Sequence, residues 1–159
     1  MKRPWNRTST NVYSLLTYDE VNDLNMNICT YVSAVNMNPR IYAIAIDYKT
    51  KTYKNLMSSS SGIVLQCLSI KNLNSVRILG KKSGHNFDKS KYLLKKKSIT
   101  HWKSYTILKD TSYLIELINP KKIYDMTDHA LFLFKIKSYK NNSNDILTFS
   151  NLIESKIIL

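Results

Sequence analysis

Residues 49–52 hold the most concentrated polar chemistry of the sequence. Lys49, Thr50, Lys51 and Thr52 follow the apolar run "RIYAIAIDY" and place two ammonium groups beside two hydroxyls. A short helix is expected to start here with Thr52 as its cap, and the free N–H groups of a helix start attract anions. The segment therefore indicates a phosphate site, in which Lys51 and Thr52 are the favoured contacts.

A second polar set precedes this site along the chain. Asn27, Thr30 and Ser33 lie within "MNICTYVSAV", which alternates with the period of a strand. Hydroxyl and backbone groups on such a strand can bond the polar edge of a flat heteroaromatic ring, and a neighbouring apolar strand supplies a dry wall. A ring slot that ends in a phosphate site is what a mononucleotide such as FMN requires. The pattern also fits an ordinary Lys-Thr turn.

Other kinds of catalytic site find little support. His85, His101 and His129 are far apart in the sequence, and no cluster of Cys, Asp or Glu has metal-ligand spacing, so no metal site is predicted. The chain has only 3 glycines and contains no GxGxxG, GxSxG or P-loop motif. If the protein is an enzyme, a cofactor is expected to supply the reactivity.

The elements that must position these residues are mostly strands. Strand-like runs occupy 11–17, 26–35, 40–48, 63–68, 112–118, 121–126 and 129–139. The run 40–48 is apolar at nearly every position and is expected to be a central strand buried on both faces. One helix is indicated after Ser69, with Ile70, Leu73, Val76 and Leu79 on one face and Gly80 at its end. We predict a mainly β protein, a barrel with a few short helices, forming one domain over 1–159 with an extended arm at 1–10.

Charge and cysteine content bound the surroundings of the protein. The net charge of +13 raises affinity for any polyanion, although a chain rich in Lys, Asn, Ile and Tyr is also expected from AT-rich codon usage. Two cysteines without a CxxC pair indicate a reducing compartment. No signal peptide and no long apolar run are evident, so a cytoplasmic protein is expected, with no membrane partner.

Five segments in register carry a family resemblance. They are "MNICTYVSAVNMNPRIYAIAIDYKTKTYKNL", "GIVLQCLSIKNLNSVRIL", "GKKSGHNFDK", "TDHALFLFKI" and "RPWNR". Together they cover roughly residues 3 to 138, and they resemble the flavin reductase-like, FMN-binding split-barrel family. The resemblance implies a split β-barrel that binds FMN, and a homodimer with its sites near the subunit interface.

The resemblance also implies roles for particular residues. The segment from Asn27 to Ser33 would line the flavin ring through Asn27, Cys29, Thr30, Tyr31 and Ser33. Lys49, Thr50, Lys51 and Thr52 would hold the phosphate, and Lys81, Lys82 and Ser83 would close over the phosphate or the ribityl chain. His129, in an Asp-His pair, would face the flavin where NADH or NADPH approaches.

Three functions remain open at this stage. The first is an NAD(P)H-dependent flavin reductase, an enzyme that passes electrons to free flavin or to an acceptor protein. The second is an FMN-binding electron carrier that does not use NAD(P)H; it is favoured by Thr127, which stands where the family has glycine. The third, a basic nucleic-acid-binding β-barrel, is disfavoured because the aromatic residues lie within apolar strands.

Overall fold

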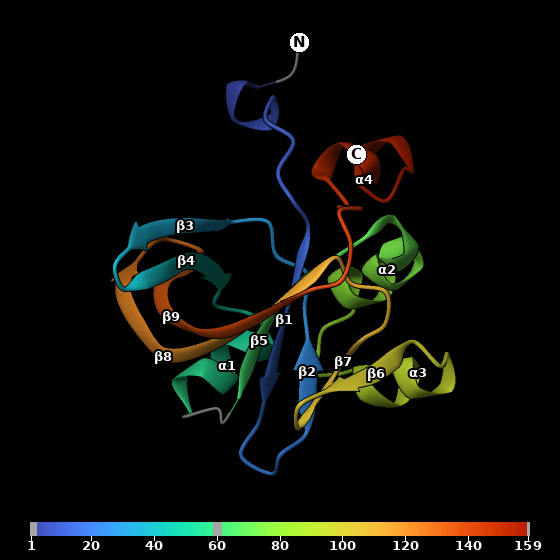
Figure 1. Ribbon diagram of the computed structural model, residues 1–159, viewed down its shortest axis with the longest axis horizontal. Helices are drawn as coiled ribbons and strands as arrows, with labels where there is room; N and C mark the ends of the chain where they lie inside the picture. The colour runs from blue at the N-terminus through green and yellow to red at the C-terminus, as the bar shows by residue number, and fades with distance from the viewer. Residues whose placement is uncertain (1–2, 59–61, 159) are drawn as a thin grey trace.

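A computed structural model describes residues 3–58 and 62–158 (Figure 1). In these ranges the strands are β1 (Tyr13–Tyr18), β2 (Leu24–Met26), β3 (Val32–Met37), β4 (Arg40–Asp47), β5 (Ile63–Cys67), β6 (Ile99–Trp102), β7 (Tyr105–Leu108), β8 (Tyr113–Asp125) and β9 (His129–Asn141). The helices are α1 (Lys51–Met57), α2 (Leu73–Lys81), α3 (Lys89–Lys95) and α4 (Phe149–Glu154), with 3-10 turns η1 (Pro4–Asn6) and η2 (Ile70–Asn72). The predicted mainly β fold with a few short helices is confirmed.

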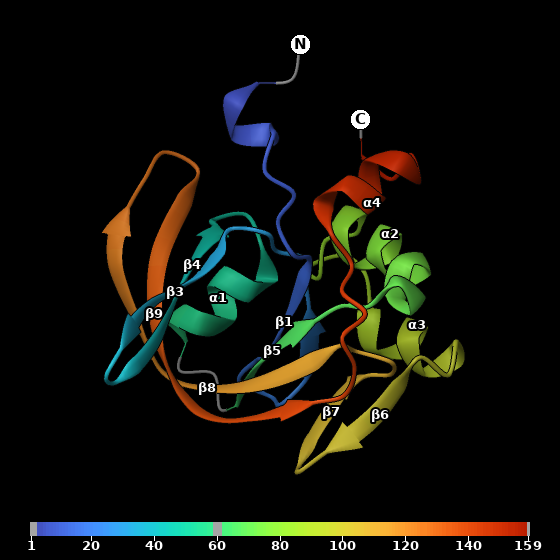
Figure 2. The same cartoon turned by 45° about the horizontal axis from the view of Figure 1, so that its top comes forward.

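Seven strands form one antiparallel sheet whose two edges are joined by a very short linker. The strand order is β2-β1-β5-β8-β9-β4-β3, so β2 and β3 lie at opposite edges although only residues 27–31 separate them. Six extended Cα steps span about 20–22 Å, whereas six strand spacings in a flat sheet span about 29 Å. The sheet must therefore curve into a barrel, as the long bends of β8 and β9 show (Figure 2).

The linker is fixed to strands at both of its ends. The Leu15 N–H donates to the Asn27 side-chain oxygen over 2.9 Å, and Cys29 pairs with Tyr13 through two backbone hydrogen bonds of 2.9 Å. At the other end, the Ala45 N–H donates to the Tyr31 carbonyl over 3.1 Å. The linker thus crosses from β1 to β4.

Two strand predictions are wrong, the first of them because of this crossing. The run 26–35 is not one strand, since it ends in β2, leaves the ladder at 27–31 and resumes in β3. The run 40–48 is not buried on both faces. In β4 only Ile44 and Ile46 are buried, because β4 lies next to the edge strand β3 instead of in the middle of the sheet.

Smaller differences concern where elements begin and end. The runs 112–118 and 121–126 are one strand, β8, with irregular register around Asn119. Helix α1 is capped by Thr50, not Thr52, because the Thr50 hydroxyl accepts from the Tyr53 N–H over 3.1 Å. Gly80 does not end α2, which runs on to Lys81. Helix α3 was not expected.

The sheet separates two apolar clusters, one on each of its faces. Alternate residues of a strand enter different clusters: Leu15 lies in the barrel interior, for example, and Leu16 packs toward the helices. The interior cluster is closed by Phe132 and Phe134, while Val76, Leu79 and Leu93 from α2 and α3 cover the outer face. Helices α1 and α2 consequently lie on opposite sides of β1 (Figures 1 and 2).

The N-terminal arm extends away from the barrel (Figure 1). It contains the turn η1, and the Trp5 side chain is 72% exposed. Its last residues join α4, because the Phe149 N–H donates to the Thr10 carbonyl over 2.8 Å.

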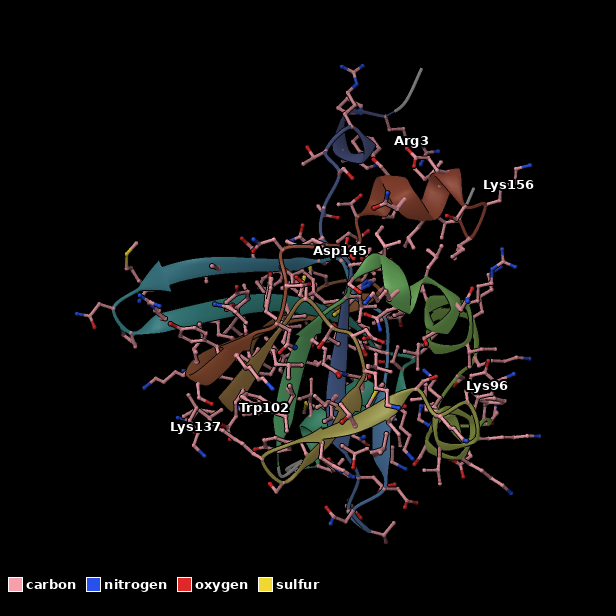
Figure 3. All side chains as sticks on the ribbon, turned by 45° about the vertical axis from the view of Figure 1, so that its right-hand side comes forward. Arg3, Lys96, Trp102, Lys137, Asp145 and Lys156 are labelled. Carbon is pink, nitrogen blue, oxygen red and sulfur yellow. The ribbon has the colours of Figure 1, made fainter. Side chains whose placement is uncertain are left out.

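Glu116 of β8 connects the β6–β7 hairpin to the large sheet. Its carboxylate is almost fully buried and accepts hydrogen bonds from Lys103, Tyr105, Lys137 and Ser138. Figure 3 shows Lys137 and Trp102, the neighbour of Lys103, on the same side of the molecule. Burial alone would raise the pKa of Glu116, but these four hydrogen bonds lower it to about 2.

We predict that E116Q destabilises the protein at neutral pH, and that the effect fades in acid. The folded pKa lies below the ordinary value near 4.5, so the stabilisation is present above pH 4.5 and is lost as pH falls toward 2. Urea unfolding at pH 7 should show a loss of roughly 2–3 kcal/mol, allowing for the partly exposed lysines. The exposed Glu154 provides the control E154Q, and equal stability of E116Q and E154Q at pH 7 would contradict the prediction.

Candidate functional site

Five lysines line a cavity of about 240 Å³ between four segments of the chain. The segments are the end of β2 with its linker, the turn from β4 into α1, the end of α2 with the loop that follows, and the first residue of α3. The lysines are Lys49, Lys51, Lys81, Lys82 and Lys89, and no Asp or Glu is among the described residues that line the cavity. Such a concentration of positive charge favours an anionic ligand.

The predicted phosphate residues do meet in this cavity. Lys49, Thr50, Lys51, Thr52, Lys82 and Ser83 all line it, together with Asn27 of the predicted ring segment. Asn27, the turn 49–52 and the loop residues 82–83 are each more than 20 residues apart in sequence, and the closure of the barrel places them around one cavity. The geometry is therefore compatible with the predicted phosphate site.

The two threonine hydroxyls differ in what they can offer to a ligand. The Thr50 hydroxyl donates to the Asp47 carbonyl over 2.7 Å as well as capping α1, so it is committed to the turn. The Thr52 hydroxyl accepts from the Asn25 amide over 3.1 Å, which leaves its own proton available for donation. Of the two hydroxyls, only that of Thr52 donates to no other described residue, and this residue is fully buried in the cavity wall.

Lys51 is partly neutralised by a carboxylate outside the cavity. Its ammonium lies 3.1 Å from Asp19, in the turn between β1 and β2. The backbone N–H of Asp23 is the main cause that lowers the pKa of Asp19, and Lys51 lowers it further. Lys49, Lys81 and Lys82 have no such carboxylate partner among the ion pairs of the described residues.

The loop after α2 packs tightly against the cavity wall at Gly84. A Cβ atom placed on Gly84 would come within 2.1 Å of the Asn25 side-chain oxygen and 3.1 Å of the Lys51 Cβ. Only glycine lets this loop approach so closely. The contact fixes Lys82 and Ser83 opposite the Lys49–Thr52 turn.

The remaining predicted ring residues do not line this cavity. The Cys29 thiol is buried, and burial raises its pKa to about 12. The backbone N–H of Cys29 donates to the Tyr13 carbonyl. Ser33 is exposed on β3, where its hydroxyl donates to the Ala34 carbonyl over 3.3 Å. Thr30 is half-buried in the linker, and Tyr31 is mostly exposed.

His129 lies beside Tyr31 instead of in the lysine cavity. The two rings have their centres 5.5 Å apart in an edge-to-face arrangement. His129 is paired in register with Asp47, the residue two before Lys49, and its Nδ1 lies 2.7 Å from the Asp128 carboxylate. The His129 hydrogen bond lowers the pKa of Asp128, and the charge of Lys49 adds to this effect. Tyr31 and His129 therefore form a ring-bearing corner close to the Lys49 end of the cavity.

Several residues of the cavity were not predicted as site residues. They are Asn25, Ile28, Leu79, Gly80, Gly84 and Lys89. Lys89 and Gly84 fall within "GKKSGHNFDK", so the family resemblance could have drawn attention to them. Asn25 is buried at a strand position, and no sequence pattern distinguishes it from a structural residue.

Among the residues that the structure describes, no group of three or more His, Cys, Asp or Glu side chains is arranged to hold a metal ion. Within the described ranges, no helix combines the length and apolar character needed to cross a membrane.

A family model described as "Flavin reductase like domain" matches residues 5–152 of the chain. No curated protein sequence matches at a significant level.

Solved structures of similar fold come from several organisms. An FMN-binding protein from Thermus thermophilus superposes with a TM-score of 0.77 at 14% identity, covering 94% of this chain and 86% of that one. An NADH:FAD oxidoreductase from Streptomyces globisporus, in complex with NAD and FAD fragments, gives 0.75 at 12% identity, with coverage of 92% and 84%. Flavoredoxin of Desulfovibrio vulgaris gives 0.68 at 20% identity, with coverage of 89% and 77%. These likenesses establish a shared fold.

We predict that G84A destabilises the protein and G80A does not. The new methyl group at residue 84 would collide with Asn25, and overpacking of this kind costs about 1–3 kcal/mol. At residue 80 of α2 the nearest atom is the Ile28 Cγ1 at 3.5 Å, an ordinary contact, so alanine should be neutral or stabilising by up to about 1 kcal/mol. Thermal unfolding of the two variants measures the difference, and a G84A variant as stable as G80A would show that the loop is not packed as described.

Proposed function

The chain belongs to the flavin reductase like domain family, and on that premise we propose that it is an FMN-binding reductase that uses NADH or NADPH. The observation that supports this best is the lysine cavity. It joins the turn 49–52, the loop 81–84 and Asn27 around one anion-sized space that no described carboxylate lines. That donor set fits the phosphate of FMN, because phosphate oxygens accept hydrogen bonds from ammonium groups and from hydroxyl groups.

In this proposal the protein binds and orients while the cofactor reacts. When bound, FMN supplies the two-electron chemistry, taking a hydride from NAD(P)H. Lys49, Lys82, Ser83 and Thr52 hold the phosphate. The linker residues Asn27, Thr30 and Tyr31 flank the ring, with Cys29 and Ser33 shaping the linker from its buried and exposed sides.

His129 is proposed to orient the nicotinamide donor. Its ring bonds the Asp128 carboxylate over 2.7 Å and contacts the Tyr31 ring edge to face, and these two contacts favour one orientation at the edge of the site. A fixed aromatic corner can hold a planar donor in the geometry that hydride transfer needs. His129 therefore needs to neither give nor take a proton.

An FMN-binding electron carrier is the second candidate. A carrier would bind FMN in the same lysine cavity as the proposed reductase, but it would not oxidise NAD(P)H. Thr127, in the loop that leads to His129, motivates it, because the family has glycine there. Flavoredoxin of Desulfovibrio vulgaris has the same fold.

Binding of nucleic acid remains the least favoured candidate. Basic side chains such as Arg3, Lys96, Lys137 and Lys156 lie at widely separated points of the surface (Figure 3). A nucleic-acid groove would gather such charges along one path with exposed aromatic rings between them.

We also propose that the protein acts as a cytoplasmic homodimer. Val35 and Met37 of the edge strand β3 are exposed, and they border an apolar hollow of about 500 Å³ that also includes Tyr42 and Ile136. A second copy of the chain would cover this surface. Light scattering should give twice the chain mass of 18.5 kDa, and a monomer at micromolar concentration would contradict this part.

We predict that the protein binds FMN and then oxidises NADH or NADPH. Added FMN should give a protein-bound visible spectrum, and the nucleotide should be consumed faster than in a protein-free mixture with the same flavin. The rate is measured as the loss of the absorbance band of the reduced nucleotide. FMN binding without nucleotide oxidation would favour the carrier, and absence of FMN binding would overturn both candidates.

A matched variant tests the part played by His129. H129A should retain FMN affinity within about threefold, since the residue lies outside the lysine cavity, while kcat/KM for the nucleotide falls roughly 10- to 100-fold through lost positioning. An unchanged kcat/KM would remove His129 from the site.

A further inference from the structure

We propose that Lys89 recognises the phosphate from the inner wall of the cavity and makes the site selective for phosphorylated over unphosphorylated flavin. This inference rests on the proposed function, because it assigns a residue to the same cavity. None of the phosphate residues expected from the sequence occupies this position, since all of them come from the turn 49–52 and the loop 81–83.

Lys89 is held rigidly inside the protein. Only 5% of the residue is exposed, although a lysine is almost never buried without a partner. Its ammonium donates to the Met26 carbonyl and to the Leu79 carbonyl, each over 2.8 Å. These carbonyls belong to the last residue of β2 and to the final turn of α2, so Lys89 connects the two walls of the cavity.

No carboxylate of the described residues forms an ion pair with Lys89, although Asp23 and Asp88 line a neighbouring hollow with it. The adjacent Asp88 is occupied in capping α3, where it accepts from the Lys91 N–H over 2.9 Å. An ammonium has three donors and two are used, so one donor remains for a group in the cavity that Lys89 lines.

An unbalanced buried charge is costly for the empty protein. Burial lowers the pKa of Lys89 to about 8, which means that folding disfavours its charged form. Two backbone carbonyls compensate only partly, since neither carries a full negative charge. A phosphate in the cavity would supply the missing negative charge. Its attraction to the Lys89 ammonium would offset the free energy lost on burying that charge and would strengthen the binding of a dianion.

This arrangement separates two kinds of contact with a flavin. Lys49 and Lys82 are exposed, so water and salt screen their attraction to a phosphate. Lys89 is shielded from water, and a charge-assisted hydrogen bond is stronger in such a low-dielectric environment than in water. Riboflavin carries the same ring and ribityl chain as FMN but no phosphate, so it gains nothing from Lys89.

The test compares FMN with riboflavin on K89M, K89R and the wild type. Titrations followed by quenching of flavin fluorescence at constant ionic strength give both affinities. K89M should lower the preference for FMN over riboflavin roughly 10- to 100-fold, the range for losing a charge-assisted hydrogen bond in a desolvated site, with riboflavin affinity changed less than about threefold. K89R keeps the charge and should retain most of the preference. K91M, an exposed lysine of the same helix outside the cavity, is the control.

The outcomes separate this inference from the proposed function. If the wild type binds neither flavin, the proposed function fails. If the wild type prefers FMN and K89M loses FMN and riboflavin affinity in equal proportion, Lys89 only supports the fold and the inference is overturned. An unchanged preference in K89M overturns it as well.

A measurement on the wild type decides the case even if K89M does not fold. Calorimetry of FMN binding at pH 8.5 in two buffers of different ionisation enthalpy should show proton uptake, because the phosphate raises the pKa of Lys89, whereas riboflavin should show none. The charged and titratable groups around Lys89 are those of Lys49, Lys51, Lys81, Lys82, Asp23, His85 and Asp88. Equal proton exchange with both flavins would contradict the inference.

Discussion

The short linker between β2 and β3 is the constraint on which the rest of the structure depends. Five residues join the two edges of a seven-stranded sheet, and they are too few to cross it while it is flat. Closure of the barrel follows from this length. It also brings Asn27 beside the turn that begins at Lys49 and the end of α2, which forms the cavity. Fold and candidate site are thus two results of one connection.

The cavity concentrates like charges that the fold must hold together. The five lysines that line the cavity repel one another. Of these five, only Lys51 has a carboxylate partner among the described residues. What opposes the repulsion is packing: Leu79 and Leu93 anchor α2 and α3 in the outer apolar cluster, and Gly84 locks the loop between them against Asn25. A bound anion would relieve the repulsion, so ligand binding and stability are linked in this protein.

The sequence was sufficient for the features that depend on neighbouring residues. Alternation and turn residues predict the mainly β fold that the structure has, because these patterns are local. The anion site indicated by the lysines and threonines of 49–52 stays a prediction, although these residues do line one cavity. The break at 27–31 could not be predicted, since it is set by the pairing of Cys29 with Tyr13, and local alternation continues through it. Thr50 and not Thr52 caps α1 because the helix begins at Lys51, and the Thr52 hydroxyl accepts from the Asn25 amide, 27 residues away in sequence. Lys89 was overlooked because its partner Met26 lies 63 residues earlier in the chain.

The β6–β7 hairpin is attached to the large sheet through side chains, and its Ile107 and Leu108 are buried in the outer apolar cluster. Its hydrogen bonds to that sheet run through side chains, namely Gln66 to the Leu108 N–H, Tyr18 to the Thr106 N–H, and the Glu116 carboxylate. No strand ladder is shared between the two sheets. An insertion at the hairpin tip, beside Ser104, would therefore leave the strand register of the barrel unchanged as long as Lys103 keeps its hydrogen bond to Glu116, so a reporter or a partner domain can be fused there.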